Sequence, residues 1–331
     1  MKRIDFIKKT ILLPTLGVSA YAGGKKTENN KSNSIKFSVF SDLHYLPNDF
    51  NWATKRLEDI ITRAKNENSE FIIHCGDFCH NVVSAKRALD IYHNAPMPVY
   101  HTIGNHEIEI TSQKMPTILK AFRLENNFYT FDKGNFRFVV FDTNYYKDTD
   151  GSYKHYIGKS LREVSKMNQH HLPPEQMQML KNALVTAKGP CVLFSHHHFS
   201  LTNLKDVIWL IKKHQKHGVM WINGHYHRNS LCLQKGLALF NLNSTTHEWY
   251  NEELNFYSKD ILKKGGAFAN HVVLFDKPCH AVITISQDGN FNIDGMQGGF
   301  YEDKIPPLPR LGDHNVDITP EVLSANFKLT V

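Results

Sequence analysis

The chain has 331 residues, of which 41% are hydrophobic and 11% aromatic, and this composition is typical of a folded protein with a sizeable core rather than of a disordered chain. Its formal net charge is +7 at pH 7, but four basic residues against one acidic residue give residues 1–22 a net charge of +3, so the remainder carries +4. Such a modest excess suits an anionic substrate and argues against nucleic-acid binding, which usually shows a clustered basic stripe.

The first residues have the pattern of an export signal. A basic start is followed by a short apolar run at 11–18 and by Ala20-Tyr21-Ala22, whose small-x-small pattern resembles a cleavage site. We therefore predict a signal peptide over residues 1–22, a polar linker over 23–34, and a mature protein that is periplasmic or secreted. The start also resembles a twin-arginine signal with lysine in place of one arginine, and the alternative is an ordinary amphipathic first helix. The apolar run is too short to span a membrane, and no other segment is long and apolar enough.

Five cysteines are present, and an odd number cannot all pair within one chain. Cys75 and Cys191 lie in apolar runs and are predicted to be buried thiols. In an exported protein a disulfide could still form from Cys79, Cys232 or Cys279.

Beyond the linker, predicted strands and helices alternate and then give way to a strand-rich end. Apolar alternation or short apolar runs predict strands at 35–41, 71–75, 98–103, 128–132, 136–143, 191–194 and 219–222. Helical spacing of apolar residues predicts helices at 52–64, 85–92, 173–187 and 204–214. From residue 231 we predict mainly antiparallel strands at 231–234, 237–241, 271–275, 281–286 and 291–293. This order favours an α/β fold of two sheets with helices outside.

Five short motifs stand where predicted strands end. In chain order they are Asp42-Leu43-His44, Gly76-Asp77, Gly104-Asn105-His106-Glu107, Ser195-His196-His197-His198 and Gly224-His225-Tyr226-His227. Sites in layered folds form in the loops beyond the carboxyl ends of strands, so these distant motifs can converge. The glycines before Asp77, Asn105 and His225 permit a tight backbone that turns each side chain inward.

These motifs supply three oxygen donors and four imidazoles, which is enough for two metal ions that share one carboxylate. Mixed imidazole and carboxylate ligation suits Zn, Fe or Mn better than Ca or Mg. Asp42 and His44 are two positions apart, so in an extended chain both point to the same side and can bind one ion, and His225 and His227 repeat this spacing. Asp77 has two carboxylate oxygens for two cations and is a good bridge. Two such ions would acidify a bridging water into hydroxide that attacks phosphorus.

The ordered set resembles the calcineurin-like metallophosphoesterases, whose signature is D-x-H, G-D, G-N-H-[DE], a later histidine block and G-H-x-H. The resemblance extends from about residue 36 to 243. It implies a four-layer α/β/β/α sandwich with two mixed sheets, which we place at residues 35–300, with 301–331 as a C-terminal tail packing on the domain.

The resemblance also implies a role for each motif residue. One ion would be held by Asp42, His44 and His227, and Asp77 would bridge. The second ion would be held by Asn105, His196 and His225. His106 would be a non-ligand histidine that stabilises charge or protonates the leaving group. Many relatives have proline where this chain has His198, which leaves His196 and His197 as alternative ligands, and alignment on the strand end favours His196.

Candidates for substrate binding lie outside the motifs or beside them. His80 follows Asp77 by three residues and could touch substrate. The segment 144–172, which contains Tyr145 and His155, is predicted to be a long loop that serves as a lid, and the alternative is an insertion without a function. A second wall could come from Trp249, Tyr250, Phe256 and Tyr257. Glu107 is predicted to support its loop or a metal-binding histidine.

Taken together, the chain is predicted to be an exported dinuclear metal-dependent phosphoric ester hydrolase that acts on a small-molecule phosphomonoester or phosphodiester. A nuclease of the same superfamily is the alternative, and the modest charge and the export signal count against it. A non-catalytic scaffold of this fold would be expected to lose ligands, whereas this chain keeps the full set and His106. Nothing in the sequence indicates an oligomeric state.

Overall fold

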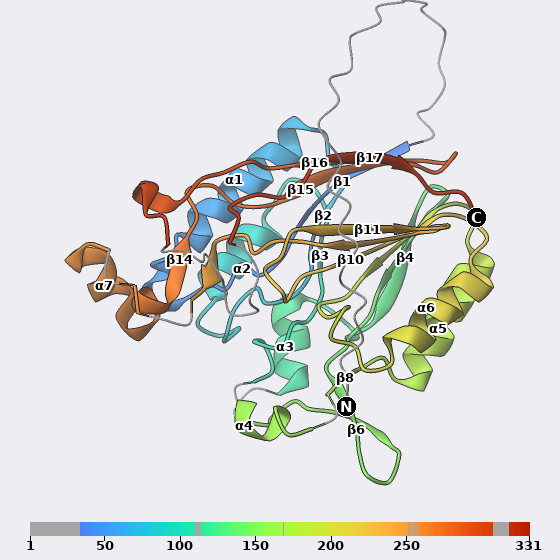
Figure 1. Ribbon diagram of the computed structural model, residues 1–331, viewed down its shortest axis with the longest axis horizontal. Helices are drawn as coiled ribbons and strands as arrows, with labels where there is room; N and C mark the ends of the chain where they lie inside the picture. Colours follow the sequence, from blue (N-terminus) through green and yellow to red (C-terminus); the bar gives the residue numbers. More distant parts are fainter. Residues whose placement is uncertain (1–33, 110–113, 168, 251–252, 255–256, 307–317) are drawn as a thin grey trace, which may run out of the picture. The chain divides into compact units, whose positions relative to one another are not determined.

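The computed structural model describes residues 34–331 except 110–113, 168, 251–252, 255–256 and 307–317. The predicted signal peptide and nearly all of the predicted linker therefore lie outside the described residues. Residues 34–331 form one compact unit built around two six-stranded sheets (Figure 1).

The first sheet has the strand order β17-β16-β15-β1-β2-β3. Its strands are β1 (Ser34–Phe40), β2 (Ile72–His74), β3 (Val99–His101), β15 (Ala281–Ser286), β16 (Asn290–Gly295) and β17 (Ala325–Lys328). β1, β2 and β3 are parallel, with Val39 opposite Ile73 and Ile73 opposite Tyr100, whereas the other three strands extend the sheet in antiparallel fashion. Its outer face packs against α1 (Ala53–Asn66), α2 (Lys86–His93) and α3 (Met115–Phe122).

The second sheet has the strand order β11-β12-β10-β9-β5-β4. Its strands are β4 (Tyr129–Lys133), β5 (Phe136–Val140), β9 (Cys191–Phe194), β10 (Val219–Asn223), β11 (Ser230–Gln234) and β12 (Leu237–Asn241). Its outer face is covered by α5 (Pro174–Thr186) and α6 (Leu204–His214), whose buried residues recur at helical spacing. β12 is parallel to β10, so it departs from the mainly antiparallel pairing predicted after residue 231.

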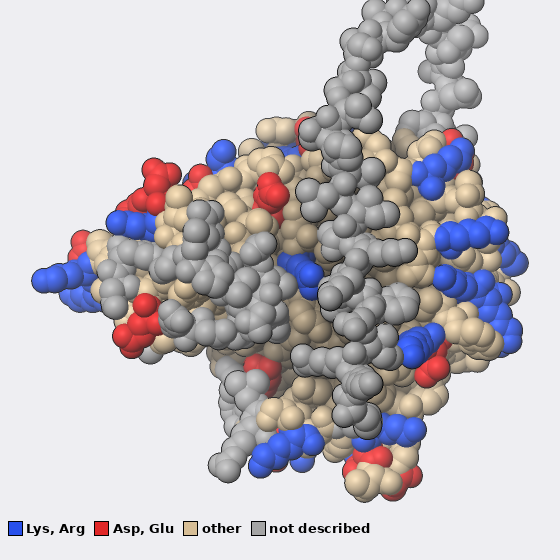
Figure 2. Space-filling view, viewed as in Figure 1, with Lys and Arg blue, Asp and Glu red and all other residues tan. Residues whose placement is uncertain are grey.

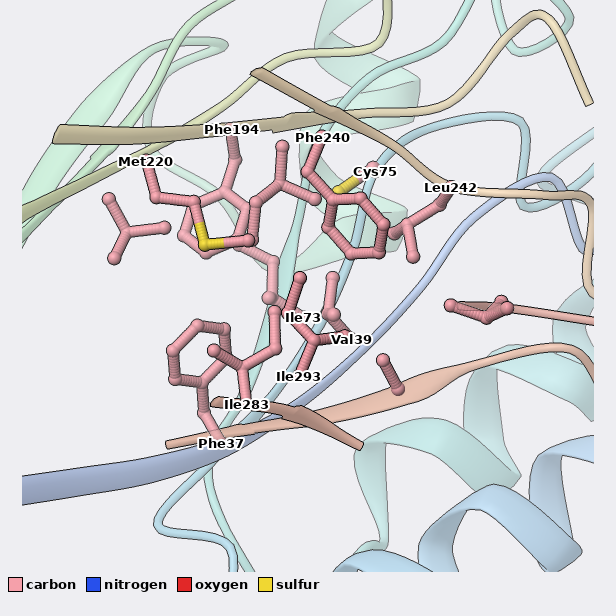
Figure 3. Packing of buried hydrophobic residues seen from close by; sticks show 14 of the residues in the cluster. Phe37, Val39, Ile73, Cys75, Phe194, Met220, Phe240, Leu242, Ile283 and Ile293 are labelled. Carbon is pink, nitrogen blue, oxygen red and sulfur yellow. The ribbon is translucent and has the colours of Figure 1, made fainter. Parts of the chain in front are cut away.

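A continuous apolar core lies between the two sheets. Figure 3 shows Phe194, Met220 and Phe240 of the second sheet facing Ile283 and Ile293 of the first. These side chains are at most 1% exposed, because both sheets turn an apolar face inward while helices cover the opposite faces. The predicted four-layer α/β/β/α sandwich with two mixed sheets is therefore confirmed.

The segment 144–172 is not the long loop that the sequence predicts. It forms a small sheet in the order β7-β6-β8, made of β6 (Tyr145–Lys147), β7 (Tyr153–His155) and β8 (Gln169–His171), with α4 (Leu161–Val164) between β7 and β8. Each of these strands has only three residues, which is too short for alternation of apolar and polar side chains to show.

The remaining elements lie beside the two sheets. They are the paired strands β13 (His247–Trp249) and β14 (Val272–Leu274), helix α7 (Lys259–Gly265), and the 3-10 helices η1 (Pro47–Asp49), η2 (Gly266–His271) and η3 (Tyr301–Asp303). Side chains of α7, η2 and β14 share a small apolar cluster with Leu46 and Phe50, which flank η1.

All five cysteines are free thiols, so no disulfide forms from Cys79, Cys232 or Cys279. Cys79 is buried beneath α1 and α2, Cys279 is buried between the sheets, and Cys232 is exposed on β11, so the three lie in different surroundings. Within the described ranges, no helix is long and apolar enough to cross a membrane.

The parallel strands determine where the motifs meet. Buried or nearly buried polar residues follow every parallel strand. These strands are β1, β2 and β3 in one sheet and β5, β9, β10 and β12 in the other. The amide N–H of Asp42 donates to the Gly76 carbonyl, and the amide N–H of Gly224 donates to the His196 carbonyl, so the loops after neighbouring strands are tied together. The carboxyl ends of the parallel strands thus form one polar edge.

Candidate metal centre

The first donor group consists of Asp42, His44 and His227, whose ligand atoms lie within 4.8 Å of one another. The two histidines approach with 3.0 Å between their Nε2 atoms. Oδ1 of Asp42 lies 3.3 Å from Nε2 of His227 and 3.8 Å from Nε2 of His44. Asp42 and His44 are fully buried and His227 is 5% exposed, so all three donors face one enclosed point.

The second donor group consists of Asn105, His196 and His225. Oδ1 of Asn105 lies 3.0 Å from Nε2 of His196 and 3.1 Å from Nδ1 of His225. His196 is fully buried, Asn105 is 8% exposed and His225 is half-buried, so this group is more open than the first.

Asp77 lies between the two donor groups. Its Oδ2 atom is 3.0 Å from Nε2 of His196 and 3.9 Å from Nε2 of His44. Its Oδ1 atom accepts a hydrogen bond of 2.9 Å from the amide N–H of His106. A single oxygen of Asp77 therefore faces both groups, whereas the sequence reasoning assigned one oxygen to each cation.

The backbone at the donors is not extended, contrary to the geometry predicted for the i, i+2 pairs. Left-handed φ angles occur at Asp42 (+53°), His44 (+43°), Asp77 (+55°), His225 (+70°) and His227 (+45°). Residues other than glycine adopt this region rarely, at a cost of order 1–3 kcal/mol each, and such strain concentrates at functional sites. The paired donors still meet, but they do so through tight turns at strand ends rather than through the alternation of a strand.

Three glycines of the motifs are required for two different reasons. Gly76 has φ +92°, which favours glycine, and an added Cβ would lie 2.4 Å from Nδ1 of His196. Gly104 and Gly224 lack a positive φ, but a Cβ at Gly104 would lie 2.1 Å from Oδ1 of Asp77, and a Cβ at Gly224 would lie 1.8 Å from Oγ of Ser41 and 2.2 Å from Oδ2 of Asp42. These two positions are therefore small because side-chain oxygens lie directly against the backbone.

Buried carboxylates that do not face the donors directly hold the loops in place. Glu107 accepts hydrogen bonds from the amide N–H groups of Asp77, Cys79 and Gly104, which is the supporting role predicted for it. Burial and the nearby Asp77 carboxylate raise the pKa of Glu107, while the amide donors to its carboxylate oppose that shift.

Three supporting groups were missed by sequence reasoning. Oε1 of Glu248 lies 3.5 Å from Nδ1 of His227, and Glu109 accepts a hydrogen bond from the side-chain amide of Asn105. His247 lies 5.4 Å from His44, measured between ring centroids. The polar run 244–248, placed directly after the apolar strand 237–241, is the signal that could have identified Glu248 and His247.

The electrostatics of the site favour positive charge. Burial lowers the pKa of His196, but the Asp77 carboxylate outweighs burial and raises it to about 9. Burial likewise opposes charge on His227, but Glu248 and Asp42 raise its pKa well above the usual value. Although burial raises the pKa of Asp77, the imidazoles of His196 and His106 hold it well below its usual range. A metal cation would supply the same positive charge after displacing the protons from the imidazoles.

His106 marks one side of the site. Its Nε2 atom is 3.9 Å from Oδ2 of Asp77, its Nδ1 atom is 3.2 Å from Oε2 of Glu109, and its side chain is 22% exposed. Nδ1 of His80 lies 3.2 Å from Nδ1 of His106. Trp249 lies beyond, with its ring 6.4 Å from that of His106 at an interplanar angle of 28°. His80 and Trp249 therefore stand beside the predicted site, although their roles toward substrate stay predictions.

Of the other residues proposed for a second wall, Tyr250 and Tyr257 are buried, and Phe256 lies outside the described residues.

The opposite side is formed by imidazoles. The ring of His197 stacks on that of His170 at 3.8 Å and lies 4.3 Å from that of His225, and Nδ1 of His197 is 2.8 Å from Oγ1 of Thr143. His196, not His197, approaches both Asp77 and Asn105, so the geometry favours the ligand that strand alignment favours.

Tyr145 and His155 lie away from the donors. Nε2 of His155 is 2.9 Å from Oδ2 of the buried Asp142, and the hydroxyl of Tyr145 accepts a hydrogen bond of 3.2 Å from Asn127. Burial raises the pKa of Asp142, but His155 outweighs burial and lowers it. Within the described part of the chain, these contacts anchor the small sheet to the end of β5 and do not reach either donor group.

The donor set fits two divalent or trivalent transition-metal cations. Ligands placed tetrahedrally at 2.0–2.1 Å from an ion lie about 3.4 Å apart, which is close to the separations of 3.0–3.8 Å within the first group. Neutral imidazoles with few carboxylates match Zn, Mn or Fe. The residues therefore converge as two cation sites that share Asp77, and the roles of individual ligands stay predictions.

Comparisons with known proteins identify the family of the chain. A family model described as calcineurin-like phosphoesterase matches residues 35–229. Among solved structures, a dimetal phosphatase from Danio rerio has a TM-score of 0.54 and 17% identity, over 79% of this chain and 95% of that chain. A putative 5′-nucleotidase from Staphylococcus aureus has a TM-score of 0.46 and 16% identity, over 81% of this chain and 54% of that chain. No curated protein matches the chain. At these identities the structural likeness concerns the fold alone.

Proposed function

Because the chain belongs to the calcineurin-like phosphoesterase family and is thus a metal-dependent phosphoric ester hydrolase, we propose that it hydrolyses a small phosphomonoester or phosphodiester at a dinuclear centre built from the two donor groups. The observation that supports this proposal most directly is the position of Asp77. One of its oxygens faces His44 of the first group and His196 of the second, as expected of a carboxylate that bridges two cations.

The two cations, when bound, would acidify a water molecule and withdraw charge from the phosphoryl oxygens. The residues of this chain would hold those cations at a fixed separation. Asp42, His44 and His227 would hold one, and Asn105, His196 and His225 would hold the other. Amide donors from the Gly76 and Gly104 turns position Glu107, which keeps the Asp77 loop from moving.

His106 would act on the ester rather than on the cations. Its Nε2 atom points toward Asp77 at 3.9 Å, and its partly exposed ring borders solvent, so an ester oxygen that leaves on this side would meet its imidazole. Nδ1 of the ring is 3.2 Å from Oε2 of Glu109, which orients the imidazole toward the place where the leaving oxygen would depart.

The nuclease alternative has weaker support. The net charge outside residues 1–22 is only +4, and basic side chains around α7 lie among acidic ones on the face shown in Figure 2. Nucleic-acid enzymes usually present a basic surface that follows the phosphate backbone.

The test combines metal content with turnover. The purified chain is loaded with Mn or Zn, and its metal content is measured by mass spectrometry beside the hydrolysis of p-nitrophenyl phosphate and bis-p-nitrophenyl phosphate. Two metals per chain, with turnover that a chelator abolishes, would support the proposal, and the ratio of the two rates would separate a monoesterase from a diesterase. Turnover that survives removal of all metal would exclude a dinuclear mechanism.

A further inference from the structure

Aromatic side chains lie beside both donor groups, and those beside the first group also contact His106. The ring of Trp249 lies 5.6 Å from that of His44 at 79° and 6.1 Å from that of Phe268 at 50°. The ring of His80 contacts both, at 6.3 Å from Trp249 and 6.0 Å from Phe268. Trp249 and Phe268, with His80 beside them, form what we call the aromatic flank. Two ring contacts therefore lead from the first donor group to Phe268.

The aromatic flank is open to solvent. Phe268 exposes 37% of its surface and Trp249 is half-buried, whereas most phenylalanine rings of the core are fully covered. An exposed phenylalanine by itself needs no explanation, but this one adjoins a tryptophan that also contacts the predicted metal ligand His44 and the predicted proton donor His106. Beside the second donor group, Tyr226 lies 5.2 Å from His225 and 6.4 Å from Phe199, measured between ring centroids.

Because the aromatic flank contacts His106 through both Trp249 and His80, we infer that the substrate is a phosphate ester whose leaving group carries a planar aromatic ring, and that this ring packs against Trp249 and Phe268. The inference rests on the proposed function, because it takes His106 to be where the leaving group departs. The phosphoryl group at the donors and the ring on the aromatic flank would then occupy adjacent places.

The chemistry of the flank selects a planar ring rather than an apolar group in general. Phe268 is tilted by 50° from Trp249, so a ring that packs against the flank can stack on one of them and meet the edge of the other. Both arrangements are favourable between aromatic rings and gain more than their buried area alone provides. A saturated ring would bury similar area without this gain.

Binding of non-hydrolysable analogues tests the inference without turnover. Benzylphosphonate mimics an aryl phosphate, cyclohexylmethylphosphonate has a ring of similar size that is not planar, and methylphosphonate has no ring. Calorimetry on the full chain loaded with Mn should show benzylphosphonate binding about tenfold more tightly than methylphosphonate, with cyclohexylmethylphosphonate between them.

Two variants and one matched control locate the preference. Phe268→Ala and Trp249→Ala should each reduce the benzyl-to-methyl ratio of affinities to about threefold or less, while the affinity for methylphosphonate and the metal content stay unchanged. Because Phe268 is exposed, its variant should fold even if the Trp249 variant does not. Phe199, which is 41% exposed and contacts His198 and Tyr226 instead, provides the control, and Phe199→Ala should keep the full ratio.

The outcomes separate this inference from the proposed function. Equal affinities for benzylphosphonate and methylphosphonate in a chain that hydrolyses phosphate esters would overturn the inference and leave the function intact. An equal loss of preference in Phe199→Ala would also overturn it. A benzyl preference that depends on Phe268, in a chain that hydrolyses no ester, would support the aromatic flank as a binding site while the proposed function fails.

Discussion

The two donor groups differ in the group that contacts Nδ1 of one of their histidines. In the first group, Nδ1 of His227 faces the buried carboxylate of Glu248 at 3.5 Å. In the second group, Nδ1 of His196 donates to the neutral carbonyl of Cys75 at 2.8 Å. The first group is almost completely enclosed, whereas His225 of the second is half-buried. A carboxylate behind an imidazole makes it a stronger ligand and fixes its orientation, so the first group should bind its cation more tightly.

This difference teaches that two predicted cation sites, each built from two imidazoles and one oxygen donor, can differ in how firmly they hold an ion. The enclosed first group is suited to keep its ion, and the open second group can admit or exchange one. The aromatic flank and His106 adjoin the first group, so the leaving group is expected to depart beside the more firmly held cation. The following experiments begin with the residue that the two groups share.

Replacement of Asp77 should abolish the difference between the groups because both lose their common carboxylate. In Asp77→Ala we expect less than one metal per chain and a loss of turnover of roughly three orders of magnitude or more, since metal-based charge stabilisation is worth several kcal/mol. Metal analysis and steady-state kinetics measure both effects. Asp90→Ala on α2, whose side chain is 50% exposed, is the control and should behave as wild type. Two retained metals with full activity would remove Asp77 from the bridging position.

Replacement of His106 should leave both groups loaded and still impair the reaction. His106→Ala is expected to keep two metals per chain and to lose about 10²–10⁴-fold in turnover, the range for general acid–base groups. The loss should be smaller for p-nitrophenyl phosphate than for an alkyl phosphate, because nitrophenolate leaves without a proton. An identical loss for both esters would contradict a role in protonating the leaving group.

Glu248 provides a way to weaken the first group selectively. Glu248→Gln keeps the shape of the side chain but removes the charge behind His227, and we expect the affinity for one of the two ions to fall by about 10–100-fold. Titration of the chain with Mn after chelation, followed by calorimetry, would show one site weakened and the other unchanged. Glu253→Gln, at an exposed position of the same region, is the matched control. A parallel loss at both sites would show that the groups are not independent.

The smallest expected effect concerns His280, which belongs to neither donor group and therefore gives a baseline for acid effects. Burial lowers its pKa to about 4 from an ordinary value near 6.5. The folded state resists protonation of His280, so the neutral imidazole contributes fully to the free energy of unfolding above pH 6.5. This contribution is lost as the pH falls toward 4, by about 3 kcal/mol in all. Nδ1 of His280 donates to the Pro278 carbonyl, a bond that asparagine can replace.

We expect His280→Asn to match the turnover of wild type at pH 7 and to lose less free energy of unfolding between pH 7 and pH 4. Urea unfolding at several pH values measures this difference. The same acid sensitivity in both proteins would show that His280 is not protonated on unfolding in this range.

The prediction from sequence succeeded where the local pattern was strong. β9, β12, β15 and α6 have the bounds predicted for them, because each is a run of apolar or helically spaced residues closed by turn residues. It failed in segment 144–172, where strands of three residues show no periodicity and depend on pairing with one another. It also missed α3, which lies directly beyond the undescribed residues 110–113.

The same distinction holds at the site. The motif residues were identifiable because each motif places a potential metal ligand beside a glycine or a second histidine at the end of an apolar run. Glu248 and His247 had only the weaker signal of a polar run after an apolar strand, and Phe268 and His170 had none, because their neighbours in sequence resemble ordinary loops. Their positions depend on β13 pairing with β14 and on β8 pairing with β6, which are contacts between distant residues.

The sequence by itself therefore determined the family, the two-sheet architecture and the set of donors, since apolar periodicity and donor chemistry are local properties of the chain. The tertiary structure decided three further matters. A single oxygen of Asp77 faces both donor groups, donors sit in left-handed turns rather than in extended strands, and Trp249 lies against His44 and His106. Each of these depends on how loops from two separate sheets pack at one edge, and packing between distant segments leaves no periodic trace in the sequence.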